Sequence, residues 1–257
     1  MTSEHAVDLN CDLGEGFGAY SIEIDEAVME NISSANVAAG FHAGDPMELE
    51  ETVEYAKEYD TAIGAHPGLP DLLGFGRRQM DVTTDEVRNY VTYQIGAVRA
   101  FCNRAGVELQ HVKPHGALYN MASNDEAVAT GIIQALDGLP DSPSLLALSG
   151  SKFATMAEEA GLDVRHEVFA DRAYNPDGTL VSRSRDGAVI HDPDRLAKRA
   201  VRMVKEGQVE TIDGKTLELE VDSICVHGDS AEATENVARL SEAFEEEGIS
   251  IAPLREL

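Results

Sequence analysis

The feature that most constrains the fold is the alternation, along the whole chain, of short apolar runs with longer amphipathic stretches. This alternation is typical of strand–helix units that surround a parallel sheet. Strands are predicted at 6–10, 35–41, 61–65, 109–113, 144–149, 164–169 and 223–227, with a further extended piece at 249–252. Helices are predicted at 23–31, 47–58, 84–105, 124–137, 152–160, 193–206 and 231–247. The pattern predicts an α/β fold in a single domain over residues 1–257.

Seven or eight strand–helix units can close into a (β/α) barrel, and an open doubly wound sheet is the competing fold. No GxGxxG motif follows the first predicted strand, so dinucleotide binding on an open sheet has no support. Two segments interrupt the alternation. Residues 67–82 are rich in Gly and Pro and predict a long loop. Residues 208–220 alternate around Asp213 and Gly214, which predicts an inserted hairpin.

The chain is strongly acidic, with 47 acidic against 20 basic residues and a formal net charge of −27. Such a surface repels phosphate backbones, so we expect no nucleic-acid partner. We interpret the charge as adaptation to a salty cytoplasm, with ordinary solubility charge as the alternative. No stretch approaches the roughly 18 apolar residues that span a bilayer, and the first residues do not resemble a secretion signal. Cys11, Cys102 and Cys225 form no CxxC motif, which favours a reducing compartment. We therefore expect a cytoplasmic protein without membrane contact.

Polar residues gather where the predicted strands end, which is where the catalytic residues of parallel barrels lie. They are Asp8, Asn10, Asp12, Glu15, His42, Asp45, His66, Lys113, His115, Asp171, Arg172, His227 and Asp229. One strand-end histidine is more often a hydrogen-bonded structural residue, but four of them together with several aspartates predict a site. The motifs GxSxG and GxxxxGK[ST] are both absent. Acid–base chemistry by Asp, His and Lys remains, with or without a divalent metal.

Six segments resemble the LamB/YcsF family, in order and across essentially the whole chain. They are DLNCDLGEGFG (8–18), ANVAAGFHAGDP (35–46), GAHPGLPDLLGFGRR (64–78), HVKPHGALYN (111–120), FADRAYNPDGTLVSR (169–183) and CVHGD (225–229). The resemblance implies a distorted seven-stranded (β/α) barrel, similar to the glycoside hydrolase/deacetylase barrels. It also implies ATP-dependent cleavage of 5-oxo-L-proline to L-glutamate, with ADP and phosphate released. ATP would be the co-substrate, and two further subunits, B and C, would be the partners.

The resemblance also suggests catalytic roles, which remain hypotheses. Either Asp12 or Asp229 would be the base that activates water. Lys113 and His115 would stabilise developing charge.

The predicted substrate-binding residues are Asn10, Arg77, Arg172 and His227, of which Arg172 or Arg77 would clamp the substrate carboxylate. A divalent metal is a further expectation, because Asp12, His42 and His66 occupy positions similar to the metal ligands of the related deacetylase barrels. Two other functions stay open. The chain could be a metal-dependent deacetylase of N-acetyl sugars, or a non-catalytic subunit that presents 5-oxoproline to its partners.

Overall fold

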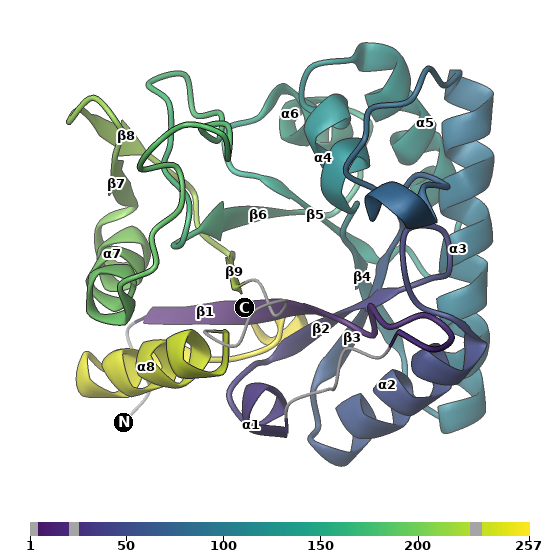
Figure 1. Cartoon of the computed structure of the whole chain (residues 1–257), viewed down its shortest axis with the longest axis horizontal. Helices are drawn as coiled ribbons and strands as arrows, with labels where there is room; N and C mark the ends of the chain where they lie inside the picture. Colours follow the sequence, from purple (N-terminus) through teal and green to yellow (C-terminus); the bar gives the residue numbers. More distant parts are fainter. Residues whose placement is uncertain (1–4, 21–25, 227–232) are drawn as a thin grey trace.

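The computed structural model describes residues 5–20, 26–226 and 233–257, and its main sheet is a closed parallel barrel (Figure 1). The barrel strands are β1 (His5–Leu13), β2 (Ser34–Ala38), β3 (Ala62–His66), β4 (Leu109–Val112), β5 (Ser144–Leu148), β6 (Val164–Phe169) and β9 (Ser223–Val226). They pair in that order, and β9 pairs with both β6 and β1. The predicted seven-stranded barrel is therefore confirmed, and the open sheet is wrong because β9 closes the ring.

β1 is longer than predicted because different parts of it pair with three neighbours. Residues 5–7 pair with β10 (Ile249–Ile251), residues 8–11 with β9, and residues 10–13 with β2. All three pairings are parallel. β10 thus extends the sheet beside the closed ring, at the amino-terminal end of β1. The carboxyl end of β1 is left to face the mouth of the barrel.

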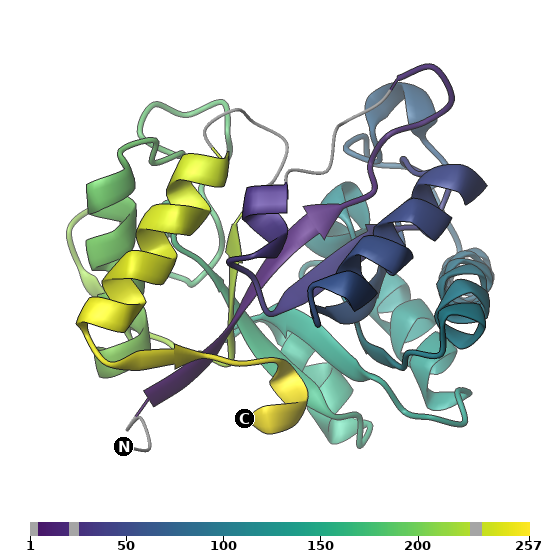
Figure 2. The same ribbon diagram turned by 90° about the horizontal axis from the view of Figure 1, so that it is seen from below.

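Helices cover the outside of the barrel. They are α1 (Glu26–Met29), α2 (Pro46–Glu58), α3 (Thr84–Ala105), α4 (Gly116–Ala122), α5 (Glu126–Asp137), α6 (Lys152–Glu159), α7 (Pro193–Glu206) and α8 (Ala233–Glu246), with short 3-10 turns η1 (Leu72–Gly74) and η2 (Leu254–Glu256). Figures 1 and 2 show α3 and α5 on one side of the barrel and α7 and α8 on the other. None of the helices in the described ranges is long and apolar enough to cross a membrane.

Helix α3 begins and ends at the predicted residues because both of its ends carry strong local signals. Thr83 and Glu86 form a capping box, and Gly106 ends the helix with φ 76°. By contrast, α4 was not predicted. It is seven residues long and directly follows the Pro114–His115–Gly116 turn, and so short a helix shows no recognisable periodicity. α4 matters for the site because it carries Tyr119.

Two further segments lie outside the barrel strands and the helices that cover them. β7 (Gln208–Glu210) pairs antiparallel with β8 (Thr216–Glu218) in the region where a hairpin is predicted. Between β6 and α7 a long irregular segment, residues 170–192, folds on itself through isolated bridges such as Arg172 with Val189 and Tyr174 with Leu180. Figure 1 shows this green segment beside the end of β6, so it forms one wall of the barrel mouth.

The barrel interior is unusually polar. Small (β/α) barrels are commonly filled by branched aliphatic side chains. Here the strands bring fully buried polar side chains inward: Asp8, Asn10, Ser34, Asn36, His111, Glu167 and Ser223. The aliphatic core lies instead between the sheet and the helices, where Val91, Ile95 and Val98 of α3 are buried. A polar interior of this kind needs internal hydrogen-bond partners, because each unpaired group would destabilise the fold.

Candidate active site

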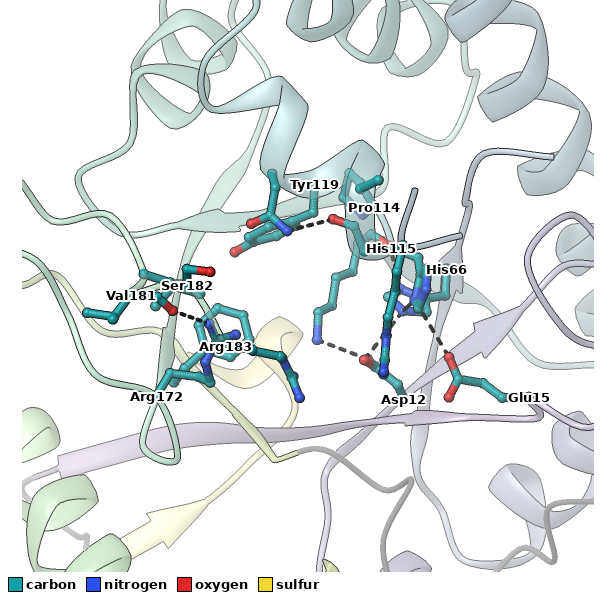
Figure 3. Close-up of a pocket in the computed structure, with 17 residues that line it drawn as sticks. Asp12, Glu15, His66, Pro114, His115, Tyr119, Arg172, Val181, Ser182 and Arg183 are labelled. Carbon is teal, nitrogen blue, oxygen red and sulfur yellow. Dashed lines mark hydrogen bonds and ion pairs between the residues drawn. The ribbon is translucent and has the colours of Figure 1, made fainter. Parts of the chain in front are cut away.

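A cavity of about 410 Å³ opens at the carboxyl ends of the barrel strands. Its first side is lined by Asp12, Glu15, His66, Lys113 and His115. Its second side, from the segment after β6, is lined by Arg172, Leu180, Val181, Ser182 and Arg183. Figure 3 shows Asp12, Glu15, His66 and His115 across the cavity from Arg172, Ser182 and Arg183. The cavity therefore has an acid and imidazole side and a guanidinium side.

Lys113, directly after β4, is the centre of an ion cluster on the first side. Its Nζ atom donates to Asp12 Oδ1 at 2.9 Å and lies 2.9 Å from Glu167 Oε1. The same atom contacts Asn10 Oδ1 at 3.1 Å and Cys225 Sγ at 3.0 Å. Burial alone would lower the pKa of Lys113, but Asp12, Cys225 and Glu167 hold it well above its ordinary value. The ammonium group therefore stays charged and holds Asp12 in place.

A second layer of polar side chains lies beneath this cluster, inside the barrel. Asn36 donates to Asn10 Oδ1 at 2.7 Å and to Asp12 Oδ1 at 2.9 Å. His111 Nε2 lies 2.6 Å from Asn36 Oδ1, which can only accept, so Nε2 carries the proton. Burial, followed by the charge of Lys113, lowers the pKa of His111 to about 3, so the ring is neutral. Asn10 is fully buried in this layer and supports Lys113 from below the cavity.

Three histidines and one glutamate converge beside Asp12, and we call Glu15, His42, His66 and His115 the Glu15 cluster. His66 Nε2 lies 3.0 Å from His115 Nδ1. Glu15 Oε1 lies 3.4 Å from His42 Nε2 and 3.6 Å from His115 Nδ1. One potential ligand atom from each residue lies within 4.8 Å of all the others, so this buried cluster could hold a metal ion.

Burial keeps two of these imidazoles neutral. Burial, followed by the neighbouring His42 and His66, lowers the pKa of His115 to about 2, although Glu15 opposes the shift. Burial likewise lowers the pKa of His42 well below its ordinary value. A neutral imidazole presents a lone pair, which makes it a metal ligand or a hydrogen-bond acceptor and not a cation. Lys113 therefore supplies a buried positive charge on this side of the cavity.

The loop at 67–82 packs against the histidines and requires glycine there. Gly76 has φ 62°, and a Cβ atom at this position would lie 2.6 Å from His42 Cβ and 2.8 Å from His115 Cδ2. A Cβ at Gly68 would lie 2.5 Å from His42 Nδ1. The carbonyl of Phe75 accepts a hydrogen bond from His115 Nε2 at 2.8 Å. The Gly-rich segment thus holds the imidazole rings by close backbone approach.

The second side of the cavity presents positive charge. Arg172 is buried, and its Nη2 donates to the Val181 carbonyl at 2.8 Å. Its Nε has no hydrogen-bond partner among the residues that the structure describes. Burial and the neighbouring charge of Arg183 lower the pKa of Arg172. Arg77, from the 67–82 loop, also lines the cavity, but it stacks over the Phe75 ring at 5.0 Å and so lies next to the histidine side. Guanidinium groups grouped in this way suit an anionic ligand.

The structure brings most of the predicted site residues together. Asp12, His66, Arg77, Lys113, His115 and Arg172 line the cavity. His42 lies behind them, stacked on His115 with ring centroids 3.7 Å apart. Of the predicted metal set, His42 and His66 belong to the Glu15 cluster, and Asp12 lies next to it, with Oδ2 3.4 Å from His66 Nε2. The predicted His227 and Asp229 lie outside the described residues.

Sequence reasoning missed five residues of the site: Asn36, His111, Tyr119, Glu167 and Arg183. Glu167 had a detectable signal, because an acid in the middle of a buried strand needs a partner. It finds Lys113, and the Tyr119 hydroxyl donates to its Oε2 at 2.8 Å. Tyr119 had no such signal, because α4 itself was not predicted. Arg183 lies in an irregular segment where nothing local indicates that it faces the cavity.

A closed parallel barrel with acids, imidazoles and guanidinium groups at the carboxyl ends of its strands has the architecture of the (β/α)-barrel enzymes. Within that class, residues 7–257 match the LamB/YcsF family, and the chain belongs to this family. It is 56% identical over 250 residues to the A subunit of 5-oxoprolinase from Thermococcus onnurineus strain NA1, covering 97% of this chain and 98% of that protein. The protein of the same name from Pyrococcus horikoshii is 54% identical over 250 residues, with the same coverage.

A solved structure supports the fold independently. The crystal structure of the lactam utilization protein from Thermus thermophilus has a TM-score of 0.92 and 43% sequence identity, over 96% of this chain and 99% of that one. A putative cellobiose-phosphate cleavage protein from Enterococcus faecalis V583 has a TM-score of 0.59 at 14% identity, over 99% of both chains. That second similarity shows a shared fold alone.

Proposed function

We propose that this chain is the A subunit of an ATP-dependent 5-oxoprolinase, which opens the ring of 5-oxo-L-proline to give L-glutamate. The observation that carries the proposal is the similarity, above 50% identity over nearly the full length, to relatives that bear the name of this 5-oxoprolinase component. The cavity adds a physical rationale, because it offers a carboxylate for proton transfer on one side and guanidinium groups for a substrate carboxylate on the other.

The reaction needs ATP because a five-membered lactam is a resonance-stabilised amide. Transfer of the terminal phosphoryl group of ATP to the lactam oxygen gives ADP and an activated, imidate-like ring carbon. One water then adds to that carbon, the carbon–nitrogen bond breaks, and the ring nitrogen takes a proton. The resulting acyl phosphate is hydrolysed by a second water, which releases L-glutamate and phosphate. The chain has no P-loop motif, which is consistent with nucleotide chemistry that is shared with, or performed by, the partner subunits B and C. We place the reaction in the cytoplasm.

We assign the general base for water attack to Asp12. Its carboxylate lines the cavity and is 13% exposed, and Lys113 and Asn36 both donate to its Oδ1. These two donors fix the carboxylate in one orientation, which is the preorganisation that proton transfer requires. Lys113 also places a lasting positive charge at the wall of the cavity, where it would stabilise an oxyanion on the attacked carbon. The neutral ring of His115 cannot supply such a charge.

We assign the substrate carboxylate to the guanidinium side of the cavity. Arg172 is held by the Val181 carbonyl, and its Nε has no hydrogen-bond partner among the described residues. A carboxylate in the cavity would pair with the guanidinium group of Arg172 and reduce the repulsion between Arg172 and Arg183. The substrate ring would then lie between the arginines and Asp12, with its reacting carbon toward the acid and imidazole side.

Reconstitution with candidate B and C subunits, measuring glutamate and ADP, tests this function. Glutamate formation should require this chain. Asp12→Asn removes the base and keeps the size of the side chain, so turnover should fall by about 10²–10⁴-fold while 5-oxoproline binding persists. Asp60→Asn is the matched control, since Asp60 is exposed at the end of α2 with φ 55°, a conformation that Asn tolerates. It should keep full turnover.

Three outcomes would contradict the proposal. Glutamate formation by subunits B and C alone would remove this chain from the reaction. Full activity of Asp12→Asn would leave the chain as a non-catalytic subunit that presents 5-oxoproline. Release of acetate from N-acetyl sugars by this chain alone, without ATP, would make it a deacetylase.

A further inference from the structure

We infer that the Glu15 cluster is a binding site for one transition-metal ion of the zinc type, with Glu15, His42, His66 and His115 as its ligands. The site differs from the metal set that the sequence suggests, because Glu15 and His115 take the place of Asp12. The inference goes beyond the proposed reaction, since metal binding can be measured without 5-oxoproline or ATP.

The proton positions on two histidines carry the first step of the argument. His66 Nδ1 lies 2.7 Å from the Lys113 carbonyl, and His115 Nε2 lies 2.8 Å from the Phe75 carbonyl. A carbonyl oxygen only accepts, so each of these nitrogens carries its ring's proton. The opposite nitrogens, His66 Nε2 and His115 Nδ1, therefore present lone pairs when the rings are neutral. They face each other at 3.0 Å.

Two lone pairs at this distance repel each other unless a cation lies between or beside them. A proton could join His66 to His115, but it would serve those two nitrogens alone. Glu15 Oε1 lies 3.6 Å from the same His115 nitrogen and 3.4 Å from His42 Nε2. Four potential ligand atoms thus converge on one place. One metal ion can bind all four of them, whereas one proton can bridge only two.

The spacing of the donor atoms matches a tetrahedral ion. Zinc–nitrogen bonds of 2.0–2.1 Å place tetrahedral ligands about 3.4 Å apart. Of the six distances among the four residues, three are 3.0, 3.4 and 3.6 Å, and all the potential ligand atoms lie within 4.8 Å of one another. Three imidazoles and one carboxylate favour zinc and similar transition metals, whereas Mg²⁺ and Ca²⁺ prefer all-oxygen sites. His66 and His115 each donate their other ring N–H to a backbone carbonyl. Metal-binding histidines are usually oriented by a hydrogen bond of this kind.

His42 must move when the ion binds. Its ring lies parallel to that of His115, with centroids 3.7 Å apart and 5° between the planes. Two parallel stacked rings cannot both direct an in-plane lone pair at one ion. Neither ring nitrogen of His42 has a hydrogen bond within the described part of the chain, so turning this ring breaks none there. We expect His42 to rotate while His66 and His115 stay in place.

Asp12 is left out of the ligand set because it does not belong to the group of described residues whose ligand atoms all lie within 4.8 Å of one another. Its Oδ1 accepts from both Lys113 and Asn36, and its Oδ2 lies 3.4 Å from His66 Nε2. Asp12 therefore lies next to the Glu15 cluster and, like Glu15, His66 and His115, lines the cavity. A bound ion of this kind lowers the pKa of a coordinated water. Any part that it plays in ring opening rests on the function proposed above.

Metal binding by the full-length chain, freed of metal with a chelator, tests the inference. We expect one Zn²⁺ per chain by equilibrium dialysis and calorimetry, and intense visible absorption bands of tetrahedral Co²⁺ when Co²⁺ is the probe. Mg²⁺ should not compete. Glu15→Gln and His115→Gln should each weaken Zn²⁺ binding by about 100-fold or more and change the Co²⁺ spectrum. The exposed His191→Gln is the matched control and should bind Zn²⁺ within about threefold of the parent chain, whereas Asp12→Asn should weaken binding less than Glu15→Gln does.

Several results would overturn the site. These are a folded metal-free chain that binds no Zn²⁺ at micromolar concentration, or Zn²⁺ binding that survives all ligand substitutions. Loss of binding in Asp12→Asn with retention in Glu15→Gln would also overturn the ligand set. Circular dichroism checks that each variant is folded, and Co²⁺ spectra of the parent chain decide the geometry even where a variant fails to fold. None of these measurements depends on glutamate formation. A result that contradicts the metal site therefore leaves the proposed reaction untouched, and the reverse also holds.

Discussion

At the scale of single residues, the most unusual group is the carboxyl of Asp8, which is fully buried inside the barrel. Ser33 and Ser34 donate to its Oδ1 at 2.7 and 2.5 Å, and Ser223 donates to its Oδ2. Burial raises the pKa of Asp8 to about 6, even though the three hydroxyl groups oppose the shift. This acid makes folding sensitive to pH.

The sign of the effect follows from proton binding. The unfolded chain has an ordinary aspartate, with a pKa of 3.8, and the folded chain binds the proton more tightly. The contribution of Asp8 to stability is therefore fully present below pH 4 and is lost as the pH rises through 6. Its size corresponds to about 3 kcal/mol of free energy of unfolding.

Asp8→Asn should remove this pH dependence, because Asn is uncharged. Its carbonyl oxygen can accept from Ser33 and Ser34, while its amide nitrogen can donate to the Ser223 hydroxyl once that hydroxyl has turned. We expect the variant to gain stability relative to the parent chain at pH 7 and to lose that advantage at pH 4.5. Urea unfolding at the two pH values measures the difference. Asp60→Asn, at an exposed position, should keep the parent profile. Equal pH slopes for the parent chain and Asp8→Asn would show that Asp8 is not the responsible group.

At the scale of the elements, close contact between neighbouring strands decides where glycine is required. Gly64 of β3 faces His111 of β4, and the register shifts between Ile63 and Gly64. A Cβ atom at Gly64 would lie 2.0 Å from His111 Nε2, the nitrogen that donates to Asn36. A Cβ atom at Gly96 of α3 would instead meet open space, with no atom of the described residues within 4 Å to resist a methyl group.

These two glycines form a matched pair. Gly64→Ala should destabilise the fold by about 1–3 kcal/mol, because His111 must shift and its hydrogen bond to Asn36 must weaken. Gly96→Ala should instead stabilise it by about 0.4–1 kcal/mol, because alanine restricts the unfolded chain and suits a helix. Chemical denaturation of both variants gives the comparison. Similar effects at the two positions would contradict the strand contact.

At the scale of the whole molecule, the net negative charge is the feature with the largest expected effect on stability. The net charge of −27 is carried largely at the surface, since Asp8, Glu15, Asp71, Glu167 and Asp171 are the only acids buried among the described residues. Like charges on a compact surface repel each other, and the repulsion is greatest at low ionic strength. Salt shortens the range of this repulsion, from about 10 Å at 0.1 M to about 3 Å at 1 M.

We therefore expect the melting temperature to rise with NaCl and to level off near molar concentration. Most of the rise should come at low concentration, because screening of surface charge acts there first. Sucrose at matched osmolality is the control, since it stabilises by exclusion from the surface without screening charge. A melting temperature that responds to sucrose but not to NaCl would mean that charge repulsion has little effect on this fold.

The sequence by itself determined the strand–helix alternation and the gathering of polar residues at one end of the barrel. The long amphipathic pattern placed α3, and the structure shows that Thr83 and Gly106 cap its ends. Asp12, His66, Lys113 and His115 could be assigned to one mouth because the carboxyl ends of parallel strands share one edge.

Only the tertiary structure decided which of these residues touch. Glu15, and not Asp12, joins the three histidines, and Glu167 lies beneath Lys113 although 54 residues of sequence separate them. Arg183 reaches the cavity from an irregular segment with no periodic pattern. The physical reason is that these contacts depend on ring closure between β9 and β1 and on the positions of side chains far apart in the chain. Local propensity and spacing carry no information about either.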